Sequence, residues 1–352
     1  MDHPLKIGFV GAGFMGQLAH IANYAELNKC RTVALAELRP GLRELVARRY
    51  GIDKTYATHA ELLADSNVDA VVAVTQRFLT GPIALDCLRA GKHVLTEKPM
   101  ASTYEQATTL VETSREAGTV YAVGYMKRYD TGVRKAKGIL ESLLVSGELG
   151  PVRYVRSHCF GGNAYCNIGG HLTTGEAFEY ELPRWPIAPA WVPEGLKKEY
   201  ERFLNTYCHN INLLRFLVGS TLKVTSVSFN GQAEWVIILD AGDYNVLLET
   251  GNYAYHGWDE VTEIYFSNGR LRISTPPPLL RGVPAHIEIY QSGQEHNLSS
   301  PYSAWSWSFR NQAEAFVDDI CNGRGSISSG EDSLEDMRLV EDIWRTYLTG
   351  QQ

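Results

Sequence analysis

The sequence predicts two domains of different class. Residues 1–125 are expected to form a doubly wound parallel α/β sheet of the Rossmann type, and residues 126–352 an α+β domain built on a large, mostly antiparallel open sheet. Three observations predict this fold: a glycine-rich turn after the first apolar run, regular alternation of strands and helices up to residue 124, and consecutive strands in the second half. A chain of 352 residues is also too long for one typical core.

Composition narrows the classes of partner. Hydrophobic residues make up 44% and charged residues 21%, as in ordinary globular proteins. The net charge of −7 disfavours nucleic acid as the main partner, and no apolar run is long enough to cross a bilayer, so a cytoplasmic protein is expected. Six scattered cysteines form no C-x-x-C pair, which indicates reduced thiols and no metal site.

The glycine-rich turn, Gly11-Ala12-Gly13-Phe14-Met15-Gly16, is expected to bind the pyrophosphate of a dinucleotide. Gly11 permits a tight turn, Gly13 leaves room for a phosphate, and Gly16 lets the following helix pack closely on the strand. Phe14 and Met15 complete the loop and are expected to contact the cofactor. The helix that opens at Gly16 would direct its unpaired N–H groups at the anion.

An acidic residue, Glu37, ends the next apolar run about 20 residues past the glycines. A carboxylate there accepts the ribose hydroxyls of NAD and repels a 2′-phosphate. Arg39 and Arg43 lie close by and make this distinction between the two cofactors less sharp. We therefore expect NAD ahead of NADP.

Alternating strands and helices continue through the first half. Strands are expected at 7–10, 32–36, 54–57, 68–75, 93–96 and 120–123, and helices from 16 and at 42–50, 60–65, 82–90 and 103–117. Parallel strands bind ligands at their carboxyl ends. Two of them end there in polar residues, Thr75-Gln76-Arg77 and Glu97-Lys98-Pro99.

Lys98 is the candidate for chemistry at this edge. It follows a buried strand directly and precedes a proline, which places an ammonium at the mouth of the nucleotide crevice. Such a group can bind a substrate hydroxyl, stabilise the alkoxide that develops as hydride leaves, and relay the proton. The alternative is a surface lysine at the end of a strand.

The glycine turn together with Gly91-Lys92-His93-Val94-Leu95-Thr96-Glu97-Lys98-Pro99 resembles the glucose-fructose oxidoreductase, inositol dehydrogenase and MocA (Gfo/Idh/MocA) family. Val123-Gly124-Tyr125-Met126-Lys127-Arg128-Tyr129-Asp130 and Gly150-Pro151-Val152 resemble its inositol dehydrogenase branch. The resemblance implies a catalytic Lys98, Glu97 near the nicotinamide ribose, and often a cis bond before Pro99. Thr75-Gln76-Arg77 replaces the family's T-P-N, so Thr75 and Gln76 are expected to contact the cofactor without that proline and asparagine.

The second half reads as a helix at 128–144 followed by strands. These are expected at 152–158, 224–229, 235–240, 244–250, 260–266, 270–274 and 287–290, with closing helices at 308–321 and 334–347. In the family, the C-terminal helix packs back on the first domain.

A helix over 203–219 carries the second candidate for chemistry. Leu204, Cys208, Ile211, Leu214 and Val218 form an apolar stripe, and Asn205, His209 and Asn212 recur on another face. His209 can accept an alcohol proton near neutral pH, or it is a core histidine bonded to a carbonyl.

This helix resembles the family's D-x-x-x-H-x-x-D pattern, which supports His209 as base. Both acids are asparagines here, so the hydrogen-bonding shape remains while the negative charge is lost. Asn205 is then expected to orient the substrate hydroxyl or Lys98.

Three further residues match substrate-facing positions of the family: Lys127, His158 and Trp258. Between His158 and Asn205 lies an insert rich in aromatic residues and proline, including Tyr165, His171, Tyr180, Trp185 and Trp191. It either stacks on a substrate larger than free inositol or docks a neighbouring subunit.

The resemblance and the residues together predict a nicotinamide-dependent oxidoreductase that transfers hydride between NAD and a secondary hydroxyl of a sugar, glycoside or cyclitol. A homo-oligomer, dimer or tetramer, is expected. Two alternatives stay open. One is a glycoside-cleaving enzyme that uses NAD transiently for oxidation and elimination, and the other is a non-catalytic sensor of NAD(P) and sugars.

Overall fold

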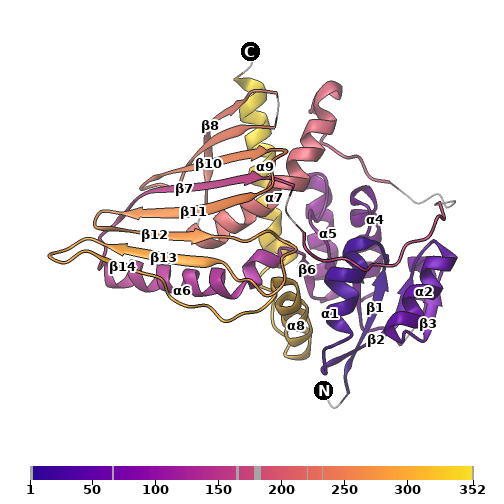
Figure 1. Cartoon of the computed structure of the whole chain (residues 1–352). Helices are drawn as coiled ribbons and strands as arrows, with labels where there is room; N and C mark the ends of the chain where they lie inside the picture. The colour runs from indigo at the N-terminus through magenta and orange to yellow at the C-terminus, as the bar shows by residue number, and fades with distance from the viewer. Residues whose placement is uncertain are drawn as a thin grey trace. The chain divides into compact units, whose positions relative to one another are not determined.

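The computed structural model describes residues 3–65, 67–163, 166–177, 184–219, 221–231 and 233–350. The chain divides into two compact units (Figure 1). The first unit comprises residues 1–125, 169–205 and 309–337, and the second unit comprises residues 126–168, 206–308 and 338–352. The first unit therefore combines the N-terminal strands and helices with two segments from the second half of the sequence.

A six-stranded, fully parallel sheet forms the centre of the first unit, in the order β3-β2-β1-β4-β5-β6. The strands are β1 (Leu5–Val10), β2 (Cys30–Ala36), β3 (Lys54–Tyr56), β4 (Ala70–Ala73), β5 (His93–Thr96) and β6 (Tyr121–Val123). The connecting helices are η1 (Gly16–Ile21), α1 (Ala22–Tyr24), α2 (Pro40–Tyr50), α3 (His59–Leu63), α4 (Arg77–Arg89) and α5 (Tyr104–Ala117). This strand order is the doubly wound arrangement, which confirms the predicted fold class.

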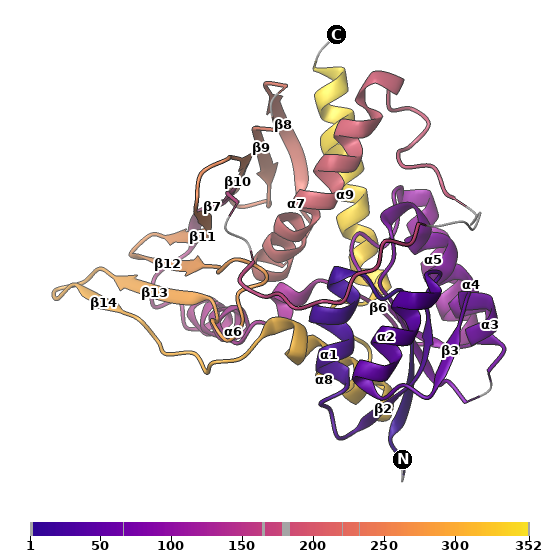
Figure 2. The same ribbon diagram turned by 45° about the vertical axis from the view of Figure 1, so that its right-hand side comes forward.

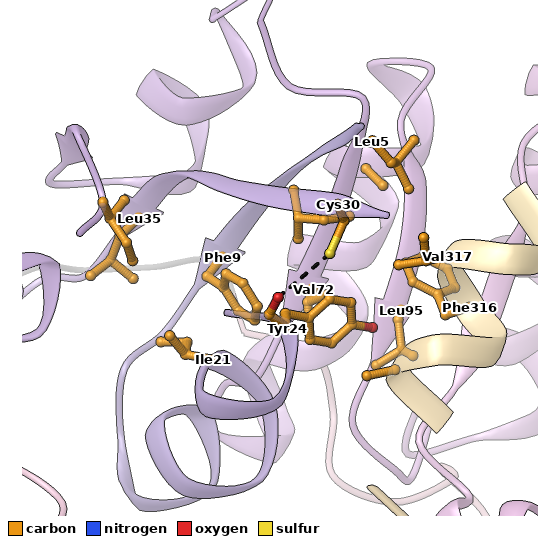
Figure 3. Packing of buried hydrophobic residues seen from close by; sticks show 14 of the residues in the cluster. Leu5, Phe9, Ile21, Tyr24, Cys30, Leu35, Val72, Leu95, Phe316 and Val317 are labelled. Carbon is orange, nitrogen blue, oxygen red and sulfur yellow. Dashed lines mark hydrogen bonds between the residues drawn. The ribbon is translucent and has the colours of Figure 1, made fainter. Parts of the chain in front are cut away.

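Both faces of this sheet are buried, which explains the nearly continuous apolar runs of its strands. On one face Phe9, Val72 and Leu95 pack with Ile21 and Tyr24 (Figure 3). Helix α8 (Ser308–Cys321) contributes Phe316 and Val317 to the same core (Figure 3). On the other face, a Cβ at Gly8 would lie 3.1 Å from Leu62 of α3.

The second unit is built on an eight-stranded sheet in the order β14-β13-β12-β11-β7-β10-β9-β8. Its strands are β7 (Val152–Gly161), β8 (Lys223–Phe229), β9 (Trp235–Asp240), β10 (Asn245–Asn252), β11 (Trp258–Phe266), β12 (Gly269–Ser274), β13 (His286–Gln291) and β14 (Asn297–Ser299). All neighbours pair antiparallel except β7 and β10. The mostly antiparallel sheet predicted from the sequence is confirmed.

Helices complete the second unit. The short η2 (Met126–Tyr129) leads into α6 (Thr131–Ser146), which packs beside β12 and β13 (Figure 2). Helix α9 (Gly330–Thr349) places Trp344 5.0 Å from the ring of Trp235 on β9, and Phe229 stacks on that indole at 4.0 Å. The boundary between the units falls within α9, and also within α7 (Lys197–Val218).

Element boundaries differ from the expectation at one informative place. Helix α4 begins at Arg77, five residues before the predicted start at Pro82. A proline inside a helix has no N–H for the carbonyl four residues earlier, here that of Phe78. The carbonyl of Phe78 instead accepts the backbone N–H of Trp185 at 3.4 Å. The strand β14, only three residues long, was not predicted.

The six cysteines all lie among the described residues, and none of them is joined in a disulfide there. Among the residues that the structure describes, no helix combines the length and the apolar character that crossing a bilayer requires.

We predict that Phe316→Ala lowers the free energy of unfolding by about 3–5 kcal/mol, because the ring is 1% exposed and its removal leaves a cavity in the core. Urea unfolding followed by intrinsic fluorescence measures the change. Val145→Ala, at a position 90% exposed, is the control and should change stability by less than about 0.5 kcal/mol. Equal effects of the two substitutions would contradict the placement of α8 in this core.

Candidate functional site

The glycine turn has the geometry that its sequence predicted. Gly11 adopts a φ of +92°, and a Cβ there would lie 2.2 Å from the carbonyl oxygen of Val74. A Cβ at Gly16 would lie 2.7 Å from the carbonyl oxygen of Gly11. Gly13 differs, because among the described atoms none lies within 4 Å of a Cβ built on it. Gly11 and Gly16 therefore allow close packing of the backbone, whereas Gly13 leaves space in front of the turn.

A cavity of about 400 Å³ opens at this turn, at the carboxyl ends of β1, β2 and β4. Of the predicted cofactor residues, Gly11, Gly13, Phe14, Met15, Gly16, Glu37, Thr75 and Gln76 line it. Glu97 and Lys98 do not line it. Leu38, Arg39, His59, Leu79 and Ile83 also line the cavity and were not singled out as cofactor contacts from the sequence.

The residues present fit a dinucleotide. Gly13 lines the cavity and has no side chain, which leaves room for a phosphate. The backbone N–H groups at the start of η1 suit an anion. Leu79, Ile83 and Val74 provide an apolar wall of the same cavity, which suits a planar base.

Glu37 binds both the glycine turn and the guanidinium of Arg39. Its carboxylate accepts the N–H of Ala12 at 2.9 Å, and it accepts Nε and Nη2 of Arg39 at 2.8 and 3.1 Å. Arg43 donates Nη1 to the carbonyl oxygen of Glu37 at 2.8 Å. The carboxylate is buried, and the N–H of Ala12 and the guanidinium of Arg39 offset the cost of its desolvation.

Lys98 and Asn205 lie together, although 107 positions separate them in sequence. Nζ of Lys98 donates to the carbonyl oxygen of Asn205 at 3.0 Å and lies 3.4 Å from its Oδ1. Both residues belong to the first unit and are partly exposed. The peptide bond before Pro99 is cis, as the family resemblance implied.

Glu97 is bound by a residue that sequence reasoning missed. Its Oε1 lies 2.7 Å from Nε2 of His20, which projects from η1, and its Oε2 accepts the N–H of Lys98 at 3.2 Å. Burial acts to raise the pKa of Glu97, but the hydrogen bond and charge of His20 and the charge of Lys98 outweigh it, so this pKa lies below its ordinary value. Glu97 is therefore an ionised carboxylate that anchors the strand end before Lys98.

His209 follows Asn205 by one turn of α7 and belongs to the second unit. It is partly exposed, whereas the predicted apolar stripe is buried at Leu204, Cys208, Ile211 and Leu214. Asn212 is buried and accepts Nε of Arg128 at 2.7 Å. The helix thus separates a buried asparagine from the partly exposed pair Asn205 and His209.

A second polar cluster lies in the second unit, around the buried carboxylate of Glu260 on β11. Lys127 forms an ion pair with Oε1 of Glu260, and Asn210 donates to the same oxygen at 2.8 Å. Trp258 donates Nε1 to Oε2 at 3.1 Å, and the Lys127 ammonium lies 6.0 Å from its ring. Two predicted substrate residues, Lys127 and Trp258, therefore share one partner that the sequence did not single out.

His158 lies on β7, the strand between β11 and β10. Its Nε2 lies 2.9 Å from Oδ1 of Asp259, and its ring stacks on Phe160 at 5.0 Å. His158 is 8% exposed. It is placed in the same unit as Lys127, Trp258 and His209.

Residues 169–205 of the insert belong to the first unit. His171 meets Phe14 edge-on at 5.0 Å, and a Cβ at Gly81 would lie 2.3 Å from the ring of Trp185, which packs on α4. Tyr165 and Tyr180 lie outside the described residues. These contacts bring the insert to the glycine turn and to α4 of its own chain.

The fold and the cavity define a dinucleotide-binding protein of the Rossmann class. Residues 5–125 match the model of an oxidoreductase family with an NAD-binding Rossmann fold, Gfo/Idh/MocA. An inositol 2-dehydrogenase of Burkholderia lata is 26% identical over 331 residues, which cover 90% of this chain and 86% of that protein. A myo-inositol 2-dehydrogenase of Thermotoga maritima is 21% identical over 346 residues, which cover 93% of this chain and 92% of that protein. Residues 5–125 therefore match the Rossmann domain of the Gfo/Idh/MocA oxidoreductases, and the similarity to inositol dehydrogenases extends over most of the chain.

Solved structures share the whole fold at low identity. A levoglucosan dehydrogenase in complex with NADH and levoglucosan superposes with a TM-score of 0.77 at 18% identity, covering 99% of this chain and 98% of that one. A 3-ketoreductase from Actinomadura kijaniata in complex with NADP and TDP-benzene gives 0.76 at 18% identity, covering 98% of each chain. This likeness concerns the fold alone, and these two proteins bind different nicotinamide cofactors.

We predict that Gly13→Ala weakens dinucleotide binding at least about tenfold and leaves the melting temperature unchanged. A methyl at this position meets no described atom within 4 Å, so the fold accepts it, but it enters the space in front of the turn. Isothermal titration with NAD measures binding. Gly138→Ala on α6, which is equally free of close contacts, is the control. Unchanged binding by Gly13→Ala would contradict the location of the pyrophosphate site.

Proposed function

We propose that the protein is a nicotinamide-dependent dehydrogenase that transfers hydride between NAD and a secondary hydroxyl of a sugar, glycoside or cyclitol. The pairing of Lys98 with Asn205 is the observation that carries the proposal. Lys98 stands two residues past the end of β5, in the unit whose cavity suits a dinucleotide, and Asn205 holds its ammonium there. The inositol dehydrogenase relatives support a polyhydroxylated ring as substrate.

Oxidation of a secondary alcohol removes a hydride from carbon and a proton from oxygen, and leaves a ketone. A bound nicotinamide supplies the acceptor for the hydride. Lys98 holds the hydroxyl oxygen and stabilises its developing negative charge, because its ammonium is a hydrogen-bond donor and a cation. His209 accepts the proton, since an imidazole exchanges protons near neutral pH. Asn205 positions Lys98, whose Nζ it contacts through two oxygens.

The remaining predicted substrate residues are proposed to bind the other hydroxyls of the ring. Trp258 offers an aromatic face for the C–H groups of a sugar. Lys127 is held by Glu260, and His158 by Asp259, so each presents a defined orientation. Fixed partners of this kind lower the entropy lost when a substrate binds.

NAD is proposed ahead of NADP. The carboxylate of Glu37 stands at the end of β2, where Rossmann enzymes bind the ribose hydroxyls. Arg39 lines the same cavity, but its guanidinium is bound to this carboxylate by two nitrogens. A homo-oligomer in the cytoplasm is proposed, as expected from the sequence.

A screen of sugars, glycosides and cyclitols with NAD and NADP tests the proposal, with the absorbance of reduced nicotinamide as the readout. We expect net reduction of NAD with at least one of these substrates. Cleavage of a glycoside with no net change in NAD, or binding of sugars without any turnover, would contradict the proposal.

We predict that Lys98→Ala lowers kcat by about 10²–10⁴-fold while the affinity for NAD changes by less than about threefold. The lysine acts on the substrate oxygen and does not line the cavity beside the glycine turn. Steady-state kinetics and titration with NAD measure the two effects. Lys198→Ala, at an exposed position of α7, is the control and should retain full activity. A Lys98 variant with ordinary kcat would overturn the catalytic assignment.

We predict that Asn205→Asp moves the pH profile of kcat/KM to higher pH. A carboxylate beside Nζ of Lys98 stabilises the protonated amine and the imidazolium of His209, so a higher pH is needed to remove the proton. Rates measured across the pH range, with the melting temperature as a check on folding, test this. An identical profile would show that Asn205 has no electrostatic link to the reaction.

A further inference from the structure

The segment 169–177 crosses the first unit from the glycine turn to α2. Gln17 on η1 donates Nε2 to the carbonyl oxygen of Leu172 at 2.9 Å and accepts its N–H at 2.7 Å. At the other end, Glu176 contacts the first turn of α2. The segment is therefore fixed beside the cavity at two points, and it brings an acidic side chain to the helix that follows β2.

The carboxylate of Glu176 occupies the N-terminus of α2. Its Oε1 accepts the N–H of Gly41 at 2.8 Å and its Oε2 accepts that of Leu42 at 3.1 Å. Thr174 donates its hydroxyl to Oε2 at 2.7 Å. The bond from Gly41 is the main cause that holds the pKa of Glu176 below its ordinary value, followed by the bond from Thr174. The side chain therefore carries a full negative charge at neutral pH.

This position bears on the choice of cofactor. In a Rossmann fold the residues just after β2 face the ribose of the adenosine half, and an arginine there accommodates a 2′-phosphate. Here that arginine is Arg39, and two carboxylates, Glu37 and Glu176, act on its guanidinium. Backbone N–H groups at a helix N-terminus also bind phosphate, but those of Gly41 and Leu42 already bind Glu176.

We propose that Glu176 is a residue that determines cofactor specificity: it takes the place of a phosphate at the start of α2 and so makes the protein select NAD over NADP. The inference rests on the proposed function and names a determinant outside the β2–α2 segment itself. A 2′-phosphate brings about two negative charges to a site where the charge of Arg39 is already balanced by Glu37 and Glu176 and where Arg43 is bound to the carbonyl oxygen of Glu37.

A purely structural role for Glu176 makes a different prediction. If the carboxylate only holds the segment 169–177 in place, its loss should weaken NAD and NADP binding alike. If its charge excludes the phosphate, its loss should strengthen NADP binding and leave NAD binding nearly unchanged. The ratio of the two affinities separates these roles, because a general loss of order cancels in it.

Isothermal titration of the full chain with NAD and with NADP tests the proposal. For Glu176→Gln we expect the preference for NAD, as a ratio of dissociation constants, to fall about tenfold, and for Glu176→Lys to fall further, because the added charge attracts the phosphate. Glu116→Gln, at an exposed position of α5, is the control and should keep the wild-type ratio. Melting temperatures of all variants verify folding.

The outcomes are distinct. An unchanged ratio in both Glu176 variants, or an equal loss of both cofactors, overturns this inference and leaves the proposed dehydrogenase intact. A wild-type protein that prefers NADP also overturns it. A wild-type protein that binds neither dinucleotide overturns the proposed function as well.

Discussion

The cavity at the glycine turn depends on the hydrogen bonds and the ion pair of one buried carboxylate, that of Glu37. A desolvated carboxylate is costly unless charged and hydrogen-bonding partners surround it. Here the N–H of Ala12 and the guanidinium of Arg39 meet that need. One side chain thereby fixes the glycine turn after β1 to the end of β2, and it sets the sign of the charge at the edge of the cavity.

The insert of residues 169–205 extends this arrangement. Pro82 lacks an N–H, so the carbonyl of Phe78 accepts the N–H of Trp185 instead. The indole of Trp185 fits against α4 because Gly81 has no side chain. Glu176 satisfies the N-terminus of α2 in a similar way. At two places in the first unit a helical backbone group has no partner within its own helix: the carbonyl of Phe78 in α4 and the N–H of Gly41 in α2. The insert supplies the hydrogen-bond partner at each.

Much of the fold was predictable because its signals are local. Alternating strands and helices predicted the parallel sheet, and helical spacing predicted the buried stripe of α7. The start of α4 was missed because proline was taken as the first helical residue. In the site, the cavity glycines and Glu37 were predictable, whereas His20 and Glu260 were not, since a lone histidine or glutamate has no distinguishing pattern around it.

The sequence by itself determined the local devices: a turn that only glycine permits at position 11, an acid at the end of β2, and a lysine directly before a proline. Each is set by backbone sterics or by neighbours within a few residues. Only the tertiary structure decided which groups they meet. Lys98 binds Asn205, 107 positions away in sequence, and Gly41 of α2 binds Glu176, 135 positions away. Such pairings depend on how the chain packs and leave no periodic pattern in the sequence.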